Sequence, residues 1–430
     1  MRTRGAVSMS QLRAIVLAAG KGVRMKSERP KVLFEANGLP LLYYPLEAAR
    51  SAGAETLIVV VGAGRQAIEE RFRAPDVNFV VQEPQLGTGH AVKCARPALQ
   101  DFDGYVVVLC GDAPLVRGQT LHRLYEHTLE SGAVCTILTC LLDNPAGLGR
   151  IIRHASGVER IVEEKDADDV QKAVKEINSG TFCFRWADLD AVLDRITPVN
   201  RQGEYYLTDA VELLIADGKR VEALVSEFPE EGLAVNSRAQ LAVVSRALRM
   251  RVIEHWMSEG VTIVDPSSTF IDARAEIGPE TTIKPFVVID GPVTIGSQCV
   301  IGPFTHVRGE CRLGSEVSLG SFVEVTRSAL GSKSRARHLA FVADARVGDD
   351  VNIAAGAITA NSDGKKVYVT EIGDGAYIGA GTIIVAPGKV AAGGATGAGA
   401  VVTKKASVPA GETWVGVPAR KLDKGGRRNG

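Results

Sequence analysis

Three short segments in the first third of the chain carry residue types suited to phosphate and nucleotide chemistry. The first is a Gly-containing loop, Leu17–Met25, which Pro30 and Lys31 follow. The loop comes directly after a buried-strand pattern, so its backbone N–H groups can approach phosphates closely. Arg24 and Lys31 can neutralise the charge of a triphosphate. Taken alone, the same pattern also fits an ordinary turn with solvated charges.

The second segment is Gly111 and Asp112, close behind the apolar run Tyr105–Leu109. An Asp just past a buried strand suits Mg²⁺, which prefers a few carboxylate oxygens together with phosphates and waters. The alternative is that Asp112 caps the helix that follows Pro114, which is a common role of Asp.

The third segment is Gln82 followed by Leu86–His90. The side-chain amide of Gln82 offers the paired donor and acceptor that uracil requires. Gly87 and Thr88 can present backbone groups to a flat base. The alternative is a Gly-rich turn that starts a helix.

These segments follow strand patterns in a stretch where strands and helices alternate, from Arg13 to about Asn236. Such alternation predicts a mainly parallel sheet with helices on both faces, and ligands bind outside the carboxyl ends of such strands. The predicted strands are Ala14–Leu17, Thr56–Val61, Val77–Val81, Tyr105–Leu109 and Val134–Leu141. The predicted helices are Leu41–Ala52, Gly64–Phe72, His90–Leu99 and Gln119–Glu130.

The second half of the chain follows a six-residue period. A six-residue period is one flat face of a triangular β-coil, with the aliphatic residue pointing inward and Gly allowing the corner. The period slips at 330–346 and breaks at 359–371, so loops are expected to protrude there, and such loops commonly carry function. The in-phase aliphatic residues are Ile277, Ile283, Ile289, Ile295, Ile301, Val307, Leu313, Leu319 and Val325.

The composition limits which kinds of binding partner and which cellular compartment are expected. Fifty basic residues balance fifty acidic ones, which gives no electrostatic reason to propose nucleic acid as a partner. No apolar run reaches membrane-spanning length. Seven cysteines without a CxxC pair indicate reduced thiols, and we expect a cytoplasmic protein. We predict a first domain at 11–236, a connecting helix at 237–260 and a coil domain at 261–430.

The segments, in this order, resemble bacterial N-acetylglucosamine-1-phosphate uridyltransferases, and the coil matches their bifunctional form, which also carries a glucosamine-1-phosphate N-acetyltransferase. The resemblance covers nearly the whole chain after about residue 12. It implies an α/β Rossmann-like nucleotidyltransferase domain, a left-handed parallel β-helix of hexapeptide repeats, and a role in peptidoglycan precursor synthesis. The motifs are Leu17–Met25 with Lys31, Gln82 with Leu86–His90, Gly111 with Asp112, Gly149 with Arg150, Glu163 with Lys165 and Asp166, Asn178–Gly180, Gln202–Asp209 and Asn236.

The resemblance implies a role for each motif of the first domain. Asp112 and Asn236 are the expected Mg²⁺ ligands, and Arg24 and Lys31 are the expected catalytic phosphate contacts. A sugar-phosphate oxygen would attack the α-phosphorus of UTP and release pyrophosphate, with no protein nucleophile required. Val23 stands where the family usually has a small hydroxyl residue. The expected nucleotide site is Leu17, Ala18, Ala19, Gly20, Lys31, Gln82, Gly87 and Thr88, and the expected sugar site is Gly149, Glu163, Asn178 and Thr208.

The coil carries a candidate acyl-transfer base, His338, in its first slip. A His there can accept a proton from a sugar amine that attacks a thioester, although a lone corner His more commonly bonds to backbone. The resemblance favours catalysis with acetyl-CoA as co-substrate, an oxyanion site at the Ala355 N–H, and Asn361 orienting His338. It implies Arg308, Asn352 and Asn361 as sugar contacts, and Ala355, Ala380 and Ala398 as CoA contacts.

Four positions depart from the family pattern. Thr326 and Val367 stand where lysines are expected, and Phe341 and Ser362 where tyrosines are expected. Losing these charge-assisted hydrogen bonds, each worth about 1.5–3 kcal/mol, would impair glucosamine 1-phosphate binding.

Three hypotheses remain open. The chain is a bifunctional enzyme with both sites, or a uridyltransferase whose coil serves as a trimerisation scaffold or acylates another amino sugar. The third is a nucleotidyltransferase for another sugar or base with a regulatory coil. The resemblance also implies that the protein is a homotrimer.

Overall fold

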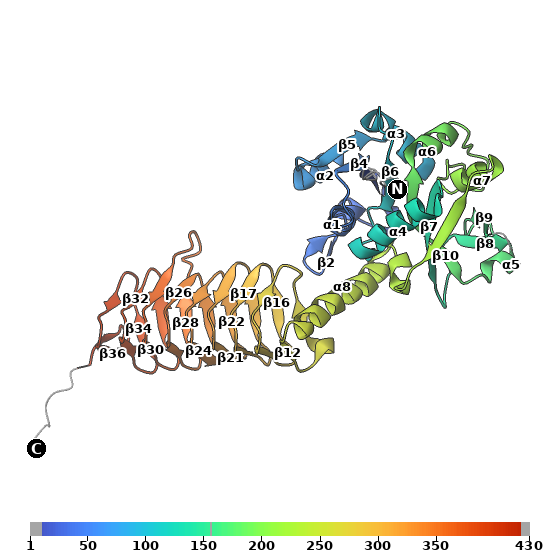
Figure 1. Ribbon diagram of the computed structural model, residues 1–430. Coiled ribbons are helices and arrows are strands. Elements are labelled where there is room, and N and C mark those ends of the chain that lie inside the picture. The colour runs from blue at the N-terminus through green and yellow to red at the C-terminus, as the bar shows by residue number, and fades with distance from the viewer. Residues whose placement is uncertain (1–10, 155–156, 423–430) are drawn as a thin grey trace, which may run out of the picture. The chain divides into compact units, whose positions relative to one another are not determined.

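The computed structural model describes residues 11–154 and 157–422, and the chain divides into two compact units between Ala247 and Leu248 (Figure 1). The division falls within one long helix, α8 (Arg238–Ser258), in the stretch where the sequence predicts a connecting helix.

The first unit is built on one sheet with the strand order β11-β7-β10-β6-β1-β4-β5. β1 pairs in parallel with β4 and β6, β4 with β5, and β7 with β11, whereas β10 runs antiparallel to β6 and β7. The prediction of a mainly parallel sheet is confirmed, and β10 runs opposite to its two neighbours β6 and β7. The strands of the first unit are β1 (Leu12–Ala18), β2 (Glu35–Ala36), β3 (Leu39–Pro40), β4 (Thr56–Val61), β5 (Val77–Val81), β6 (Tyr105–Cys110), β7 (Cys135–Leu141), β8 (Arg150–His154), β9 (Gly157–Val162), β10 (Glu176–Arg185) and β11 (Val221–Val225). β2 and β3 form a separate pair, and the hairpin β8–β9 joins the sheet through β10.

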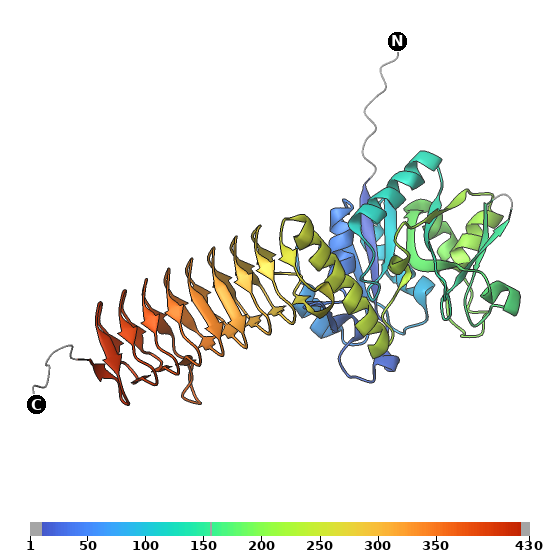
Figure 2. The ribbon, with the colours of Figure 1, turned by 90° about the horizontal axis from the view of Figure 1, so that it is seen from below.

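Helices cover both faces of this sheet (Figure 2). The predicted helix His90–Leu99 is wrong in its bounds: α3 starts at Thr88 and ends at Cys94, and a 3₁₀ turn follows, because Pro97 has no N–H to continue an α-helix. The α-helices are α1 (Tyr43–Ser51), α2 (Arg65–Phe72), α3 (Thr88–Cys94), α4 (Gly118–Ser131), α5 (Asp169–Lys172), α6 (Trp186–Leu193) and α7 (Asp209–Ala216). The 3₁₀ turns are η1 (Val23–Met25), η2 (Lys31–Leu33), η3 (Arg96–Leu99), η4 (Pro229–Gly232) and, in the second unit, η5 (Pro266–Ser268).

Two hydrophobic cores form because successive side chains of a strand point to opposite faces. Ile15 and Val106 pack into the core that holds residues of α3, α6 and α7. Ala14 and Val107 pack into the core that holds residues of α1 and α4. Central strands buried on both faces therefore read as uninterrupted apolar runs, which is why the sequence reveals them.

The second unit is a β-helix with three parallel sheets, one for each face of the coil (Figures 1 and 2). The first face contains β12 (Thr262–Ile263), β15 (Thr282–Ile283), β18 (Val300–Ile301), β21 (Ser318–Ser321), β24 (Arg335–His338), β27 (Asn352–Ile353), β30 (Tyr377–Ile378), β33 (Ala395–Thr396), β36 (Thr413–Val415) and the antiparallel β37 (Arg420–Lys421). The second contains β13 (Phe270–Ile271), β16 (Val288–Asp290), β19 (His306–Arg308), β22 (Glu324–Thr326), β25 (Phe341–Ala343), β28 (Ile358–Ala360), β31 (Ile383–Val385) and β34 (Val401–Val402). The third contains β14 (Glu276–Ile277), β17 (Val293–Ile295), β20 (Cys311–Leu313), β23 (Ala329–Leu330), β26 (Ala345–Val347), β29 (Thr370–Ile372), β32 (Lys389–Val390) and β35 (Ser407–Val408).

The slip at 330–346 is not a protruding loop, contrary to the prediction. Ser318 pairs with Arg335, one residue sooner than Val300 pairs with Ser318, so the coil loses one residue per turn. The shortened corners hold Arg327 and Asp344, both with φ of 46°. The break at 359–371 does form a loop.

That loop is a hairpin between β28 and β29. Tyr368 N–H donates to Asn361 O at 2.7 Å, and Ser362 forms a β-bridge with Val367. The hairpin therefore closes on itself at the edge of the coil.

We expect Ile301→Ala to destabilise the β-helix by about 2–5 kcal/mol, because Ile301 is fully buried inside the coil and its truncation leaves a cavity. The measurement is the thermal unfolding transition, with hydrogen exchange of peptides spanning 282–319. Val300→Ala, at the outward-facing neighbour, is the control and should cost far less. Equal losses in the two variants would contradict the inward packing.

Candidate functional site

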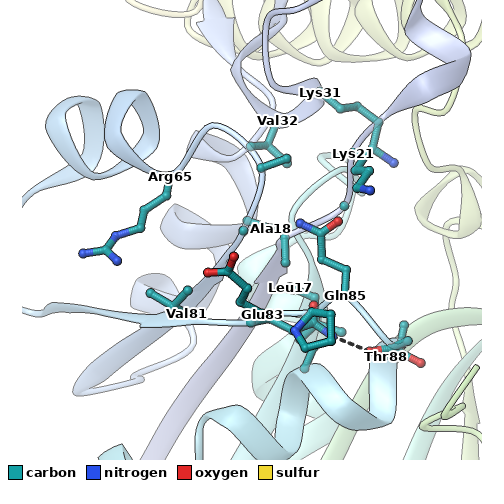
Figure 3. Close-up of a pocket in the computed structure, with 18 of the residues that line it drawn as sticks. Leu17, Ala18, Lys21, Lys31, Val32, Arg65, Val81, Glu83, Gln85 and Thr88 are labelled. Carbon is teal, nitrogen blue, oxygen red and sulfur yellow. Dashed lines mark hydrogen bonds between the residues drawn. The ribbon is translucent and has the colours of Figure 1, made fainter.

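A pocket of about 890 Å³ lies where β1, β4, β5 and β6 end, at the edge predicted for ligands (Figure 3). It brings together every residue of the expected nucleotide site, and Asp112 as well. The lining residues are Leu17, Ala18, Ala19, Gly20, Lys21, Lys31, Val32, Gly62, Ala63, Arg65, Val81, Gln82, Glu83, Pro84, Gln85, Gly87, Thr88, Ala91, Cys110, Asp112 and Glu204.

One cation joins the two expected metal ligands. The Lys31 ammonium donates to Asp112 Oδ2 and, at 3.0 Å, to Asn236 Oδ1. The backbone supports this meeting, since Val235 N–H donates to Asp112 O at 2.8 Å. Asp112 and Asn236 therefore share one cation, and in this structure that cation is the Lys31 ammonium.

The donor set suits Mg²⁺ held largely by its substrate. Among the described residues no group of three or more His, Cys, Asp and Glu side chains is arranged to hold a metal ion. One carboxylate and one amide leave coordination positions for phosphates and waters, which is how Mg²⁺ is usually bound.

The cations around the pocket differ from those expected. Lys21 and Arg65 line the pocket with Lys31 (Figure 3), whereas Arg24 is exposed on η1 and is not part of the lining. Lys21 lies inside the Gly loop, so its place in the sequence already indicated a phosphate-facing position. Gly22 has φ of 62°, and a Cβ there would lie 2.8 Å from Lys31 Cβ, so this glycine lets the loop pack against Lys31.

One end of the pocket is formed by Gln82 and residues of Leu86–His90, which the sequence predicts as base contacts. Gln82 is only 4% exposed, and its Nε2 donates to Gly87 O at 2.8 Å. Gly87 has φ of 118°, and a Cβ there would meet Tyr205 O at 2.6 Å, so only glycine fits. Thr88 Oγ1 accepts from Leu207 N–H at 2.9 Å, which ties this segment to the one before α7.

The four expected sugar contacts also come together. Asn178 N–H donates to Gly149 O at 2.9 Å, and Thr208 Oγ1 donates to Glu163 Oε1 at 3.4 Å. A Cβ on Gly149 would lie 3.5 Å from Glu163 Oε2. The cluster adjoins the pocket through Cys110, whose Sγ lies 3.7 Å from Gly180 O.

Burial and neighbouring carboxylates raise the pKa of two acids, one inside this cluster and one next to it. Burial raises the pKa of Glu163, and burial together with Glu212, Glu163 and Asp166 raises the pKa of Asp209 to about 6. Asp209 was not singled out by its sequence, because its pKa shift comes first from burial, which only the packed structure shows, and then from Glu212 of its own helix together with Glu163 and Asp166.

A buried carboxylate ties together the two segments that carry the expected metal ligands. Glu231, on η4, is fully buried and accepts from Arg117 N–H at 2.9 Å and from the hydroxyl of Thr120 at 2.8 Å. The hydroxyl of Ser226 donates to it at 2.6 Å. Glu231 thereby anchors the segment before Asn236 to the start of α4, the helix that follows Asp112.

On the coil, His338 and the expected CoA contacts share one edge. Gly356 N–H donates to His338 O at 3.4 Å, Gly381 N–H to Ala355 O at 2.8 Å, and Gly399 N–H to Ala380 O at 2.8 Å. His338, Ala380 and Ala398 are exposed. Small residues thus leave the surface open on the C-terminal side of His338.

The expected sugar contacts of the coil divide between faces. Arg308, which pairs with Glu324 at 2.8 Å, ends a strand of the second face, and Asn361 follows another strand of that face. Asn352 is part of β27 on the first face. The amide of Asn361 donates to Asp344 at 2.5 Å, and no hydrogen bond joins it to His338 within the described ranges.

The departing positions differ in their surroundings. Thr326 is buried, and the guanidinium of its neighbour Arg327 binds both oxygens of Asp344, at 2.8 and 2.7 Å. Phe341 is half-buried on β25. Ser362 and Val367 face one another across the hairpin bridge.

Comparison with known proteins agrees with this architecture. The MobA-like NTP transferase domain matches residues 14–168, and the bacterial transferase hexapeptide (six repeats) matches 274–309 and 292–327. The "Bifunctional protein GlmU" of Heliobacterium modesticaldum is 44% identical, over 94% of this chain and 95% of its own length. The proteins of the same name from Desulfitobacterium hafniense (strain Y51) and Geobacillus thermodenitrificans are each 40% identical, over 92% and 91% of this chain and 94% and 92% of their own lengths.

The fold and the pocket thus define a nucleotidyltransferase joined to a hexapeptide-repeat acyltransferase domain. The chain belongs to the family of bifunctional GlmU proteins. It is an enzyme of UDP-N-acetylglucosamine synthesis, a step toward peptidoglycan, by uridylyl transfer and acetylation of glucosamine 1-phosphate. Within the part of the chain that the structure describes, no helix has the length and apolar character of a membrane span.

We expect Glu231→Ala to lower the free energy of unfolding by about 3 kcal/mol, because it removes the acceptor of the Arg117 N–H and of the Thr120 hydroxyl. It also leaves the Ser226 hydroxyl with only its longer contact, to Phe228 O at 3.2 Å. Chemical denaturation of the variant measures this loss. Glu230→Ala, which removes a partly exposed partner of Arg117, is the matched control and should cost under about 1 kcal/mol. Comparable stabilities would show that the Glu231 contacts are dispensable.

Proposed function

We propose that the first domain catalyses attack of a phosphate oxygen of N-acetylglucosamine 1-phosphate on the α-phosphorus of UTP. The new P–O bond forms as the bond to the pyrophosphate leaving group breaks. The observation that carries this proposal is the single cation, the Lys31 ammonium, shared by Asp112 and Asn236. Such transfer depends on positioning and charge neutralisation, which these groups supply.

Asp112 and Asn236 would hold Mg²⁺, which supplies neutralisation of phosphate charge when bound. Lys31 and Lys21 would donate to phosphate oxygens, since both line the pocket. Arg24 stays a proposed phosphate contact, and its exposed position on η1 means that it would have to reach the nucleotide from outside the lining.

Gln82, Gly87 and Thr88 would read uracil, and the backbone of Leu17, Ala18, Ala19 and Gly20 would face the nucleotide. Gly149, Glu163, Asn178 and Thr208 would bind the amino sugar. Their mutual contacts and their proximity to Cys110 in the pocket lining support this assignment.

On the coil, His338 would take a proton from the amine of glucosamine 1-phosphate as the nitrogen attacks the thioester carbon of acetyl-CoA. The amide bond forms, and the C–S bond breaks to release the CoA thiolate. The Ala355 N–H would stabilise the oxyanion. Arg308, Asn352 and Asn361 would contact the sugar, and Ala355, Ala380 and Ala398 would contact CoA. The open edge beside His338 supports this arrangement.

We also propose a homotrimer assembled through the β-helix. Phe286, Phe304 and Phe322 stack along the edge that continues to His338, with centroid distances of 4.9 and 5.2 Å. All three are exposed, as is Leu339 beside them. An exposed apolar stripe of this kind commonly marks a protein interface, and covering by further copies of the chain fits it. No hydrogen bond joins Asn361 to His338 within the described part of one chain, which is consistent with a site completed by assembly.

The hairpin bears on how fast the coil acetylates glucosamine 1-phosphate. Ser362 and Val367 pair there and offer neither a phenol nor an ammonium group. The three-part domain division at 236/237 and 260/261 stays a prediction.

We expect Asp112→Ala to reduce pyrophosphate release from UTP by at least about 100-fold, because it removes the only carboxylate of the proposed metal site. Circular dichroism should show an unchanged fold. Asp143→Ala, at a fully exposed Asp, is the control and should retain activity. Normal turnover in Asp112→Ala would exclude Asp112 from the mechanism.

We expect acetyl transfer to glucosamine 1-phosphate to be slow in a thiol-release assay, because the four departing positions lack the charged and phenolic groups of the family pattern. His338→Ala should abolish the release that remains, while pyrophosphate release in the same preparation persists. Fast release would show that Thr326, Phe341, Ser362 and Val367 do not impair acetyl transfer. Unchanged release in His338→Ala would exclude His338 as the base.

A further inference from the structure

The side-chain amide of Gln82 has a defined orientation. Its Nε2 lies 2.8 Å from Gly87 O and 3.2 Å from His90 Nδ1. A backbone carbonyl only accepts hydrogen bonds, so the amide atom that faces Gly87 O must be the nitrogen. Both amide protons are therefore used on the protein side. Oε1 has no hydrogen-bond partner among the described residues, and Gln82 lines the pocket.

His90 can accept this second proton only as a neutral ring with its own proton on Nε2. Burial lowers the pKa of His90, and the nearby Lys93 lowers it further. The Nε2 side faces Cys94 Sγ at 3.9 Å, and the ring lies tilted against Tyr205. These surroundings favour the neutral imidazole and leave Nδ1 as the acceptor.

We propose that His90 is a positioning residue that holds the Gln82 amide with its carbonyl oxygen toward the base and thereby selects uracil over cytosine. The inference rests on the proposed function, in which Gln82 reads the base. Uracil presents an N3–H donor, which a carbonyl oxygen accepts. Cytosine presents a lone pair at N3, which the same oxygen repels.

His90 completes what Gly87 begins. Gly87 O fixes one amide proton, but the second proton of a side chain that is 96% buried needs its own acceptor. Without His90 Nδ1 that proton has no acceptor, and rotation of the amide toward another partner then lowers its free energy. The position of His90, inside the first turns of α3, therefore bears on base choice although the ring need not touch the nucleotide.

The test is His90→Phe, which keeps an aromatic ring and removes the acceptor. We expect the KM for UTP to rise about tenfold with kcat within about twofold, and the UTP-to-CTP ratio of kcat/KM to fall about tenfold. His90→Asn, whose Oδ1 can accept in place of Nδ1, should recover most of the ratio. Cys94→Ala, on the other side of the ring, is the matched control and should leave the ratio unchanged. An unchanged ratio in His90→Phe overturns the proposal.

Gln82→Ala separates this inference from the proposed function. If that variant loses the UTP-to-CTP preference while His90→Phe keeps it, Gln82 reads the base and only the role of His90 fails. If Gln82→Ala keeps the preference, the assignment of Gln82 as base reader fails. Nitrogen NMR of the histidine-labelled full-length protein covers the case in which His90→Phe does not fold. The expected signal is an unprotonated Nδ1 at His90, and a proton on Nδ1 overturns the proposal.

Discussion

The catalytic domain depends on bringing one carboxylate and one amide close enough to share a positive charge. Lys31, Asp112 and Asn236 come from three separate segments, and one ammonium contacts the other two side chains. Two acceptors that face the same point need a cation, since without one their partial and full negative charges oppose each other. The parallel strands end at this point, and Glu231 fastens the last segment to α4. The sheet, its loops and the buried carboxylate thus serve one electrostatic requirement.

In the proposed function, recognition of the base depends on which hydrogen bonds of the buried Gln82 amide the protein already makes. Gly87 can be only glycine, because its backbone conformation and the contact with Tyr205 leave no room for a side chain. Its carbonyl then orients Gln82, and His90 takes the remaining proton. Because both protons of the amide nitrogen are bonded to the protein, only the Gln82 carbonyl oxygen remains for a ligand, and it can only accept a hydrogen bond.

The β-helix is stabilised in a different way, because a repeated aliphatic residue points inward and is buried in every turn. Ile283, Ile289 and Ile295 are buried on its three faces in succession. The outward positions and corners are then free to vary, and one edge carries both the stacked phenylalanines and His338. The shortened corners at Arg327 and Asp344 change which outward residues align, while the buried ladder continues unbroken.

The sequence by itself determined the fold class, and the eight residues of its expected nucleotide site all line one pocket, although it left out Lys21 and Arg65. Apolar runs and a six-residue period report burial directly, because each is set by which side chains leave water. It missed β10 and the hairpin β8–β9, whose burial patterns are mixed, and it placed a protruding loop where the coil only shortens. Only the tertiary structure decided that Lys31 meets Asn236, that Gln82 meets His90, and that Asn361 bonds to Asp344 and not to His338. These meetings depend on distances between separate segments, and local spacing carries no information about such distances.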